Sequence, residues 1–93
     1  MSETLSISVN IEVRVQGVWF RAWSLKEATF LGLSGWVRNK PDGSVEAVFS
    51  GPEDVVRKML ERFWDGPIQA QVRSVIDELC APPNSGFYQL PTD

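Results

Sequence analysis

Between residues 15 and 21 the chain reads Val15-Gln16-Gly17-Val18-Trp19-Phe20-Arg21, and this stretch joins a strand pattern to a helix pattern. No Ser, Thr, Asp or Asn precedes the helix to cap it. Arg21 falls in or near the first helical turn, where the helix dipole disfavours a cation by about 0.3–1 kcal/mol. An uncapped helix start with open backbone amides and an arginine suits an anion. The alternative is that Arg21 pairs with a distant carboxylate and Gly17 only makes a turn.

Length and composition predict one domain over residues 1–93, with its core at about residues 5–90. The net charge of −3 argues against broad binding to nucleic acid or to anionic membranes. Cys80 is the one cysteine and there is no histidine, which excludes an internal disulfide, His-dependent triads and the usual His-rich zinc sites. The acid-containing start leads into alternating residues, so we expect no signal peptide, no membrane span and a cytoplasmic location.

Strand patterns occur in five places, and the first alternates without a fault, with its odd-numbered residues apolar. The five expected strands are Leu5–Val15, Leu33–Asn39, Ser44–Ser50, Ile68–Leu79 and Phe87–Leu90. The second and third are joined by Lys40-Pro41-Asp42-Gly43, which fits a type I turn closed by a left-handed glycine. The apolar parity changes along the fourth strand, so we expect a bulge near Ser74. The fifth is expected at a sheet edge.

Two helices are predicted between these strands. The first covers Ala22–Leu31 and is stopped by Gly32 at the C′ position. Its expected apolar face is Ala22, Leu25, Ala28 (or Thr29) and Leu31, with Trp23 and Phe30 as further core residues. The second opens with Gly51-Pro52-Glu53-Asp54, where a proline and two acids suit a helix start. Its expected buried face is Val55, Val56, Met59, Leu60 and Phe63, and Gly66-Pro67 is expected to end it.

The element order βαββαβ with a short extra C-terminal strand predicts an α+β, ferredoxin-like sandwich, with two helices on one face of an antiparallel sheet. Helix crossovers make the first two strands parallel, so their ends lie at the same edge. The Gln16–Phe20 loop, Arg21 and Asn39 are therefore expected to converge there. Asn39 is either part of the turn, since asparagine favours turns, or an amide positioned beside an anion site.

These residues carry a resemblance to a known family. The stretches Val15–Arg21, Gly32-Leu33-Ser34-Gly35-Trp36-Val37-Arg38-Asn39 and Asp42-Gly43-Ser44-Val45-Glu46 closely resemble the two signature stretches of acylphosphatase. The likeness covers nearly the whole chain without a large insertion. One departure is Val13, where many members of the family have glycine.

The resemblance implies hydrolysis of an acyl phosphate to a carboxylate and inorganic phosphate, with no metal and no organic cofactor. In that family the loop matching Gln16, Gly17, Val18, Trp19 and Phe20 cradles the phosphoryl group. The arginine matching Arg21 binds it, and the asparagine matching Asn39 orients the attacking water. Acyl phosphates carry a good leaving group, so positioning and charge stabilisation can supply much of the catalysis.

Other functions of the same fold compete with this hypothesis. Ferredoxin-like domains also bind RNA through aromatic residues on the open sheet face, but the first strand has no aromatic residue and the chain is acidic. A non-catalytic phosphate-binding module, or an assembly module of a carbamoyl-transfer or hydrogenase-maturation system, is the alternative. Assembly domains belong to much longer chains, so a free-standing hydrolase is favoured. We expect a monomer that binds neither nucleic acid nor membrane.

Overall fold

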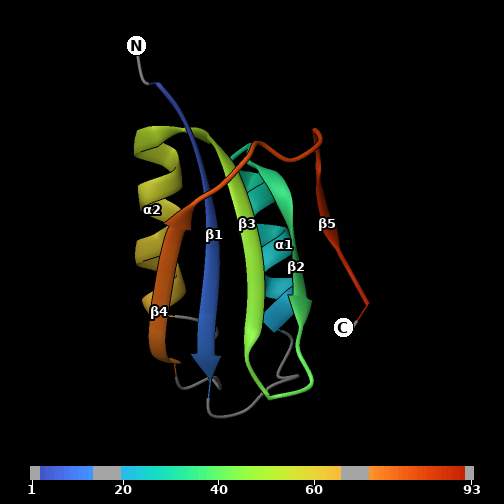
Figure 1. Cartoon of the computed structure of the whole chain (residues 1–93). Coiled ribbons are helices and arrows are strands. Elements are labelled where there is room, and N and C mark those ends of the chain that lie inside the picture. Colours follow the sequence, from blue (N-terminus) through green and yellow to red (C-terminus); the bar gives the residue numbers. More distant parts are fainter. Residues whose placement is uncertain (1–2, 14–19, 66–71, 92–93) are drawn as a thin grey trace.

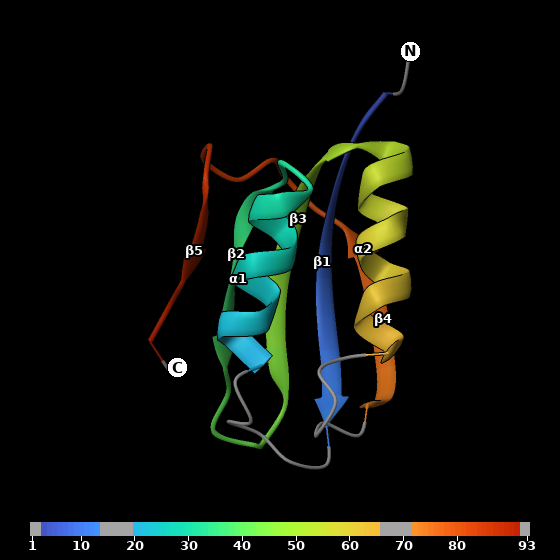
Figure 2. The same cartoon turned by 180° about the vertical axis from the view of Figure 1, so that it is seen from behind.

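The computed structural model describes residues 3–13, 20–65 and 72–91. It shows a five-stranded sheet with two helices packed on one of its faces (Figures 1 and 2). The predicted ferredoxin-like α+β sandwich is therefore confirmed. Arg14 and Val15, the Gly66-Pro67 helix stop and residues 68–71 lie outside the described residues.

Seven elements make up the fold: β1 Thr4–Val13, α1 Phe20–Phe30, β2 Ser34–Asn39, β3 Val45–Pro52, α2 Glu53–Asp65, β4 Val72–Leu79 and β5 Phe87–Gln89. The strand order across the sheet is β4-β1-β3-β2-β5. The first four strands pair antiparallel, whereas β5 pairs parallel with β2. The short last strand thus lies at a sheet edge, as predicted, and makes the sheet mixed.

The alternation of β1 produces the central row of the core. Ile7, Val9 and Ile11 are at most 2% exposed and face the helices. Burying each such side chain contributes about 1.5–3 kcal/mol relative to leaving it in water. On the opposite face, Ser6 forms a hydrogen bond of 2.7 Å between its Oγ and that of Ser50 on β3.

Helix α2 follows its predicted pattern closely. Val56, Met59 and Phe63 are fully buried, and Val55 and Leu60 pack partly against the same core. These positions recur at intervals of three and four residues, which places them on one face of a helix. Within the described part of the chain, neither helix is long and apolar enough to cross a membrane.

The predicted apolar face of α1 was partly right, because Ala28 is fully buried and Trp23 and Leu31 pack partly against the core. The helix begins at Phe20, two residues earlier than expected, and its buried residues are Phe20, Ser24 and Ala28. Ala22 is exposed, and Phe30, expected in the core, is 79% exposed. Phe20 accounts for part of the difference, because its ring packs 5.6 Å from that of Phe63 and adds the start of α1 to the core.

The end of α1 and the β2–β3 turn match the prediction. Gly32 has a φ of +73° and donates to the carbonyl of Thr29 at 3.1 Å, while Leu33 donates to that of Ala28 at 2.9 Å. This pair of bonds is a Schellman motif, which ends helices at a left-handed glycine. In the turn, Gly43 has a φ of +92° and donates to the carbonyl of Lys40 at 3.1 Å.

The bulge expected near Ser74 is also present. Ser74 pairs with Glu12 and Val72 pairs with Val13, so Arg73 has no partner in the β1–β4 register. The extra residue changes the parity of β4. Val72 and Val75 can therefore both pack against the core although an odd number of positions separates them.

Candidate active site

The predicted site residues that the structure describes lie at one end of the sheet, where β1 and β2 finish. Figure 1 shows that β1 and β2 both end there, where the first turn of α1 begins. Arg21 is the second residue of α1, and Asn39 is the last residue of β2. The topology therefore brings these two residues to the same edge, as expected from parallel strands joined by a helix. Gln16, Gly17, Val18 and Trp19 lie outside the described residues.

Arg21 is held by the backbone of the C-terminal segment. Its Nη1 donates to the carbonyl oxygen of Leu90 at 3.0 Å, and the amide of Leu90 donates to the carbonyl of Val37 at 2.8 Å. Leu90 thus joins the first turn of α1 to β2. Within residues 3–13, 20–65 and 72–91, no carboxylate pairs with Arg21, so the alternative of a distant ion pair finds no partner there.

A guanidinium group has five N–H donors, and the bond to Leu90 occupies one. The first turn of α1 contains no acidic residue that would neutralise the positive end of the helix dipole. The cation and the dipole therefore reinforce one another. Together they favour an anion at the start of α1.

Asn39 supplies a buried amide at the same edge. The residue is 8% exposed and lies on the face of β2 that also carries Val37. Its Oδ1 has no hydrogen-bond partner among the described residues. A buried acceptor left in this state costs about 1–3 kcal/mol, which a bound water or ligand could recover by donating a hydrogen bond.

Phe20 was predicted as part of the phosphate-binding loop, and the structure limits what it can contribute. Its side chain is fully buried, with its ring 5.4 Å from that of Trp23 and 5.6 Å from that of Phe63. Phe20 therefore anchors the start of α1 in the core. A contact with an anion would have to come from its backbone amide, which lies at the open end of the helix.

Two ionisable groups in the described part of the chain have shifted pKa values. The pKa of Asp42, next to the site, is lowered from its ordinary value because its carboxylate accepts hydrogen bonds from the side chain and backbone of Ser44. Burial raises the pKa of the Cys80 thiol. Cys80 therefore stays protonated near neutral pH, which disfavours a role as nucleophile.

No group of three or more His, Cys, Asp or Glu side chains in the described part of the chain could hold a metal ion. The chemistry available at this edge is that of an arginine, an amide and backbone N–H groups. Such a set can bind and orient an anion and a water molecule.

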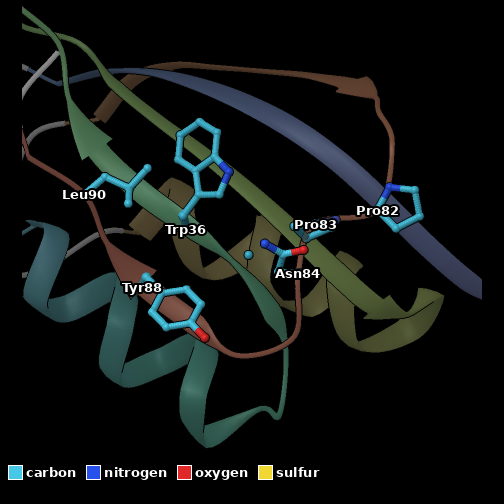
Figure 3. A pocket seen from close by; sticks show the side chains of 7 residues that line it. Trp36, Pro82, Pro83, Asn84, Tyr88 and Leu90 are labelled. Atoms are coloured by element: carbon cyan, nitrogen blue, oxygen red, sulfur yellow. The ribbon is translucent and has the colours of Figure 1, made fainter.

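A separate hollow of about 360 Å³ lies on the sheet face opposite the helices (Figure 3). Its walls come from β2, β5 and the loop before β5, namely Gly35, Trp36, Pro82, Pro83, Asn84, Tyr88 and Leu90. Trp36 and Tyr88 are paired across the two strands. Neither Arg21 nor Asn39 lines this hollow, so it is distinct from the predicted site, although Leu90 belongs to its wall and also holds Arg21.

Comparison with known proteins identifies the family. The family model described as Acylphosphatase matches residues 7–87, which is most of the chain. The chain belongs to the acylphosphatase family. A curated acylphosphatase of Nitrobacter hamburgensis is 49% identical over 89 residues, covering 88% of this chain and 90% of the relative. That of Rhodospirillum rubrum is 46% identical over 88 residues, covering 94% and 97%.

The solved structures agree with this assignment. The structure of an acylphosphatase from Coxiella burnetii superposes with a TM-score of 0.88 at 38% sequence identity, covering 94% of this chain and 93% of that one. The chain is thus an enzyme of the acylphosphatase family, whose members hydrolyse acyl phosphates. The family inferred from the signature stretches is confirmed.

Sequence reasoning missed Leu90 as part of the site. Its contribution is a backbone carbonyl, and backbone groups carry no residue-specific signal in a sequence. The predicted edge strand Phe87–Leu90 was the one available sign of this contact. It was not enough, because the pattern of that strand does not show which strand it pairs with.

Proposed function

We propose that the chain hydrolyses acyl phosphates by attack of water on phosphorus, with the phosphoryl group bound by Arg21 and the water oriented by Asn39. The observation that carries this proposal is the buried Oδ1 of Asn39, which has no partner among the described residues and lies at the end of the sheet where Arg21 stands in the first turn of α1. A water molecule that donates a hydrogen bond to this oxygen keeps its lone pairs free. We propose that one of these lone pairs attacks the phosphorus atom of the substrate.

The reaction needs no group that the site lacks. Water forms a new bond to phosphorus while the bond from phosphorus to the acyl oxygen breaks, and the acyl group leaves as a carboxylate. The attacking water must lose a proton, and we assign that proton to the oxygens of the transferred phosphoryl group. The products are a carboxylate and dihydrogen phosphate, so atoms and charge balance. Arg21 stabilises the charge spread over the equatorial oxygens.

The backbone amides of Gln16, Gly17, Val18, Trp19 and Phe20 are proposed as the rest of the phosphate cradle. This role follows from the family signature at these positions and from the start of α1 at Phe20. Gly17 would allow the backbone to approach the anion closely. A side chain at position 17 should therefore weaken phosphate binding.

The test is hydrolysis of benzoyl phosphate, followed by its ultraviolet absorbance, in the presence of a chelator. Hydrolysis should persist in chelator and fall sharply in Arg21→Ala and in Asn39→Ala. Inorganic phosphate should inhibit the wild type and Asn39→Ala similarly, because Asn39 acts on water, but should inhibit Arg21→Ala weakly. A folded wild type that binds phosphate without hydrolysing the substrate would instead indicate a binding module, and Val13→Gly would then be the first variant to examine.

We also propose that the enzyme is a monomer in the cytoplasm. One sheet edge is β5, which has three residues, and short edge strands resist pairing with another chain. The other edge, β4, carries the charged residues Arg73, Asp77 and Glu78. The single cysteine suits a reducing compartment. Light scattering over a range of concentrations would test the monomer, and cell fractionation would test the location.

A further inference from the structure

The β2–β3 turn follows directly after Asn39, and its hydrogen bonds lead back to that residue. We propose that Asp42 is a positioning residue for Asn39, because its carboxylate holds Ser44 and Ser44 holds the backbone that presents the Asn39 amide. The inference rests on the role proposed above for Asn39. It adds a residue that touches neither substrate nor water and that sets turnover through another side chain.

The contacts form a short chain of bonds across the turn. Asp42 Oδ1 accepts two hydrogen bonds from Ser44, one from its backbone N–H at 2.9 Å and one from its Oγ at 2.6 Å. The carbonyl oxygen of Ser44 in turn accepts a hydrogen bond from the N–H of Lys40 at 2.9 Å. Lys40 follows Asn39 in the chain. The Asp42 carboxylate is therefore connected to the backbone next to Asn39 through Ser44 and Lys40.

The direction of the Asn39 amide depends on the backbone that carries it. Its Oδ1 is buried and has no partner among the described residues, so no hydrogen bond at that atom fixes its direction there. Catalytic groups must be held within about 0.5 Å of their productive position. A misplacement of about 1 Å can lower a rate by a factor on the order of 100. The angle at which β2 enters the turn should therefore affect turnover directly.

The turn itself does not need Asp42 in order to form. Gly43 closes it in the left-handed conformation with a bond of 3.1 Å to Lys40, and β2 and β3 pair over six residues beside it. Ser44 is 6% exposed and is also held by the packing around it. Removal of the exposed Asp42 carboxylate should thus leave the hairpin folded and loosen its last turn. That separation makes the proposal testable by kinetics.

The experiment is a double-mutant cycle with benzoyl phosphate as substrate and inorganic phosphate as inhibitor. Asp42→Ala should lower kcat about tenfold in the wild-type background, the effect of misplacing the group that orients the water. The inhibition constant of phosphate should stay within about twofold, since Arg21 is not displaced. Asp42→Asn keeps an acceptor oxygen and should recover most of the kcat. Asp77→Ala, which removes an exposed carboxylate from β4, is the matched control and should behave as wild type.

The decisive measurement is Asp42→Ala in the Asn39→Ala background, where we expect no further loss of kcat. An equal loss in both backgrounds would overturn the inference, because Asp42 would then act independently of Asn39. So would an unchanged kcat in Asp42→Ala, or a weakened phosphate inhibition with kcat retained.

The same cycle separates this inference from the function on which it rests. If Asn39→Ala alone leaves kcat unchanged, the role proposed for Asn39 fails and the inference fails with it. If Asn39→Ala is slow and Asp42→Ala is not, the inference alone fails. Ser44→Ala, which removes the 2.6 Å bond and leaves the 2.9 Å bond, replaces Asp42→Ala if that variant does not fold, with an expected loss of about threefold.

Discussion

The two helices of this enzyme begin in opposite ways. Helix α2 starts with Glu53 and Asp54 in its first turn, and the amide of Glu53 donates to the carbonyl of Glu3 at 2.8 Å. Helix α1 has no acid in its first turn and carries Arg21 there instead. The start of α2 is thus stabilised by the chain itself. The start of α1 is left suitable for an external anion, at a cost to stability in the absence of one.

The buried faces of the two helices differ in the same sense. All three fully buried residues of α2 are apolar, whereas α1 buries Ser24, whose Oγ has no partner among the described residues. A buried hydroxyl without a partner costs about 1–3 kcal/mol. The buried face of α2 therefore contributes to stability throughout, whereas the buried Ser24 of α1 lowers the stability of the folded protein.

The largest expected effect comes from giving α1 the charge of α2. Arg21→Glu should lower kcat/KM by at least about 100-fold, because it removes a charge-assisted hydrogen bond and places a negative charge beside the phosphate. Stability to urea should change by no more than about 1 kcal/mol, since the gain at the helix dipole offsets the lost bond to Leu90. Arg57→Glu in α2 is the control and should retain wild-type kinetics. A retained kcat/KM in Arg21→Glu would remove Arg21 from the site.

The reverse exchange tests the start of α2. Glu53→Arg should destabilise the protein by about 1–2 kcal/mol, because an acid is lost and a cation gained in the first turn, and because Glu53 no longer pairs with Arg57. Urea unfolding measures the loss, and kcat should not change. Glu61→Arg, outside the first turn, should shift stability by less than about 0.5 kcal/mol. Equal effects at both positions would show that the helix start is not special.

A smaller effect is expected from removing the buried hydroxyl of α1. Ser24→Ala should stabilise the enzyme by about 1 kcal/mol without changing KM, since the methyl group needs no hydrogen-bond partner. Thr29→Ala, an exposed position on the same helix, reports the gain of about 0.5 kcal/mol that comes from helix propensity alone. If Ser24→Ala destabilises the protein, the hydroxyl has a partner that matters, and the contrast between the two buried faces would disappear.

The smallest effect concerns the turn at the same edge of the sheet. The pKa of Asp42 is lowered from 3.8 in the folded state. Its hydrogen bonds to Ser44 therefore stabilise the protein above about pH 4, and this stabilisation disappears as the carboxylate is protonated at lower pH. The wild type should therefore lose Tm more steeply than Asp42→Asn between about pH 4 and pH 2. Parallel Tm curves for the two proteins would show that the Asp42 carboxylate does not contribute to folding.

Most of the architecture was predictable because its signals are local. The alternation of β1 and the buried face of α2 repeat with the period of a strand and of a helix, and the Pro-Asp-Gly turn is specified by its own three residues. The placement of Arg21 and Asn39 at one end of the sheet was predictable for another reason, since it follows from the topology, whereas their roles in catalysis remain predictions. The burial of Phe20 and Ser24 in α1 was not predicted, because Phe20 was assigned to the loop and Ser24 is not apolar.

The family, the element order and the types of side chain at the site could all be read from the sequence, because polarity patterns and residue types are local properties of the chain. The burial of Phe20 and Ser24 on α1, the parallel pairing of β5 with β2 and the hydrogen bond from Arg21 to the Leu90 carbonyl became known from the folded chain alone. A three-residue strand has too few side chains to specify its neighbour. A backbone carbonyl is the same in every residue, so the contact that positions Arg21 exists only once the chain has folded.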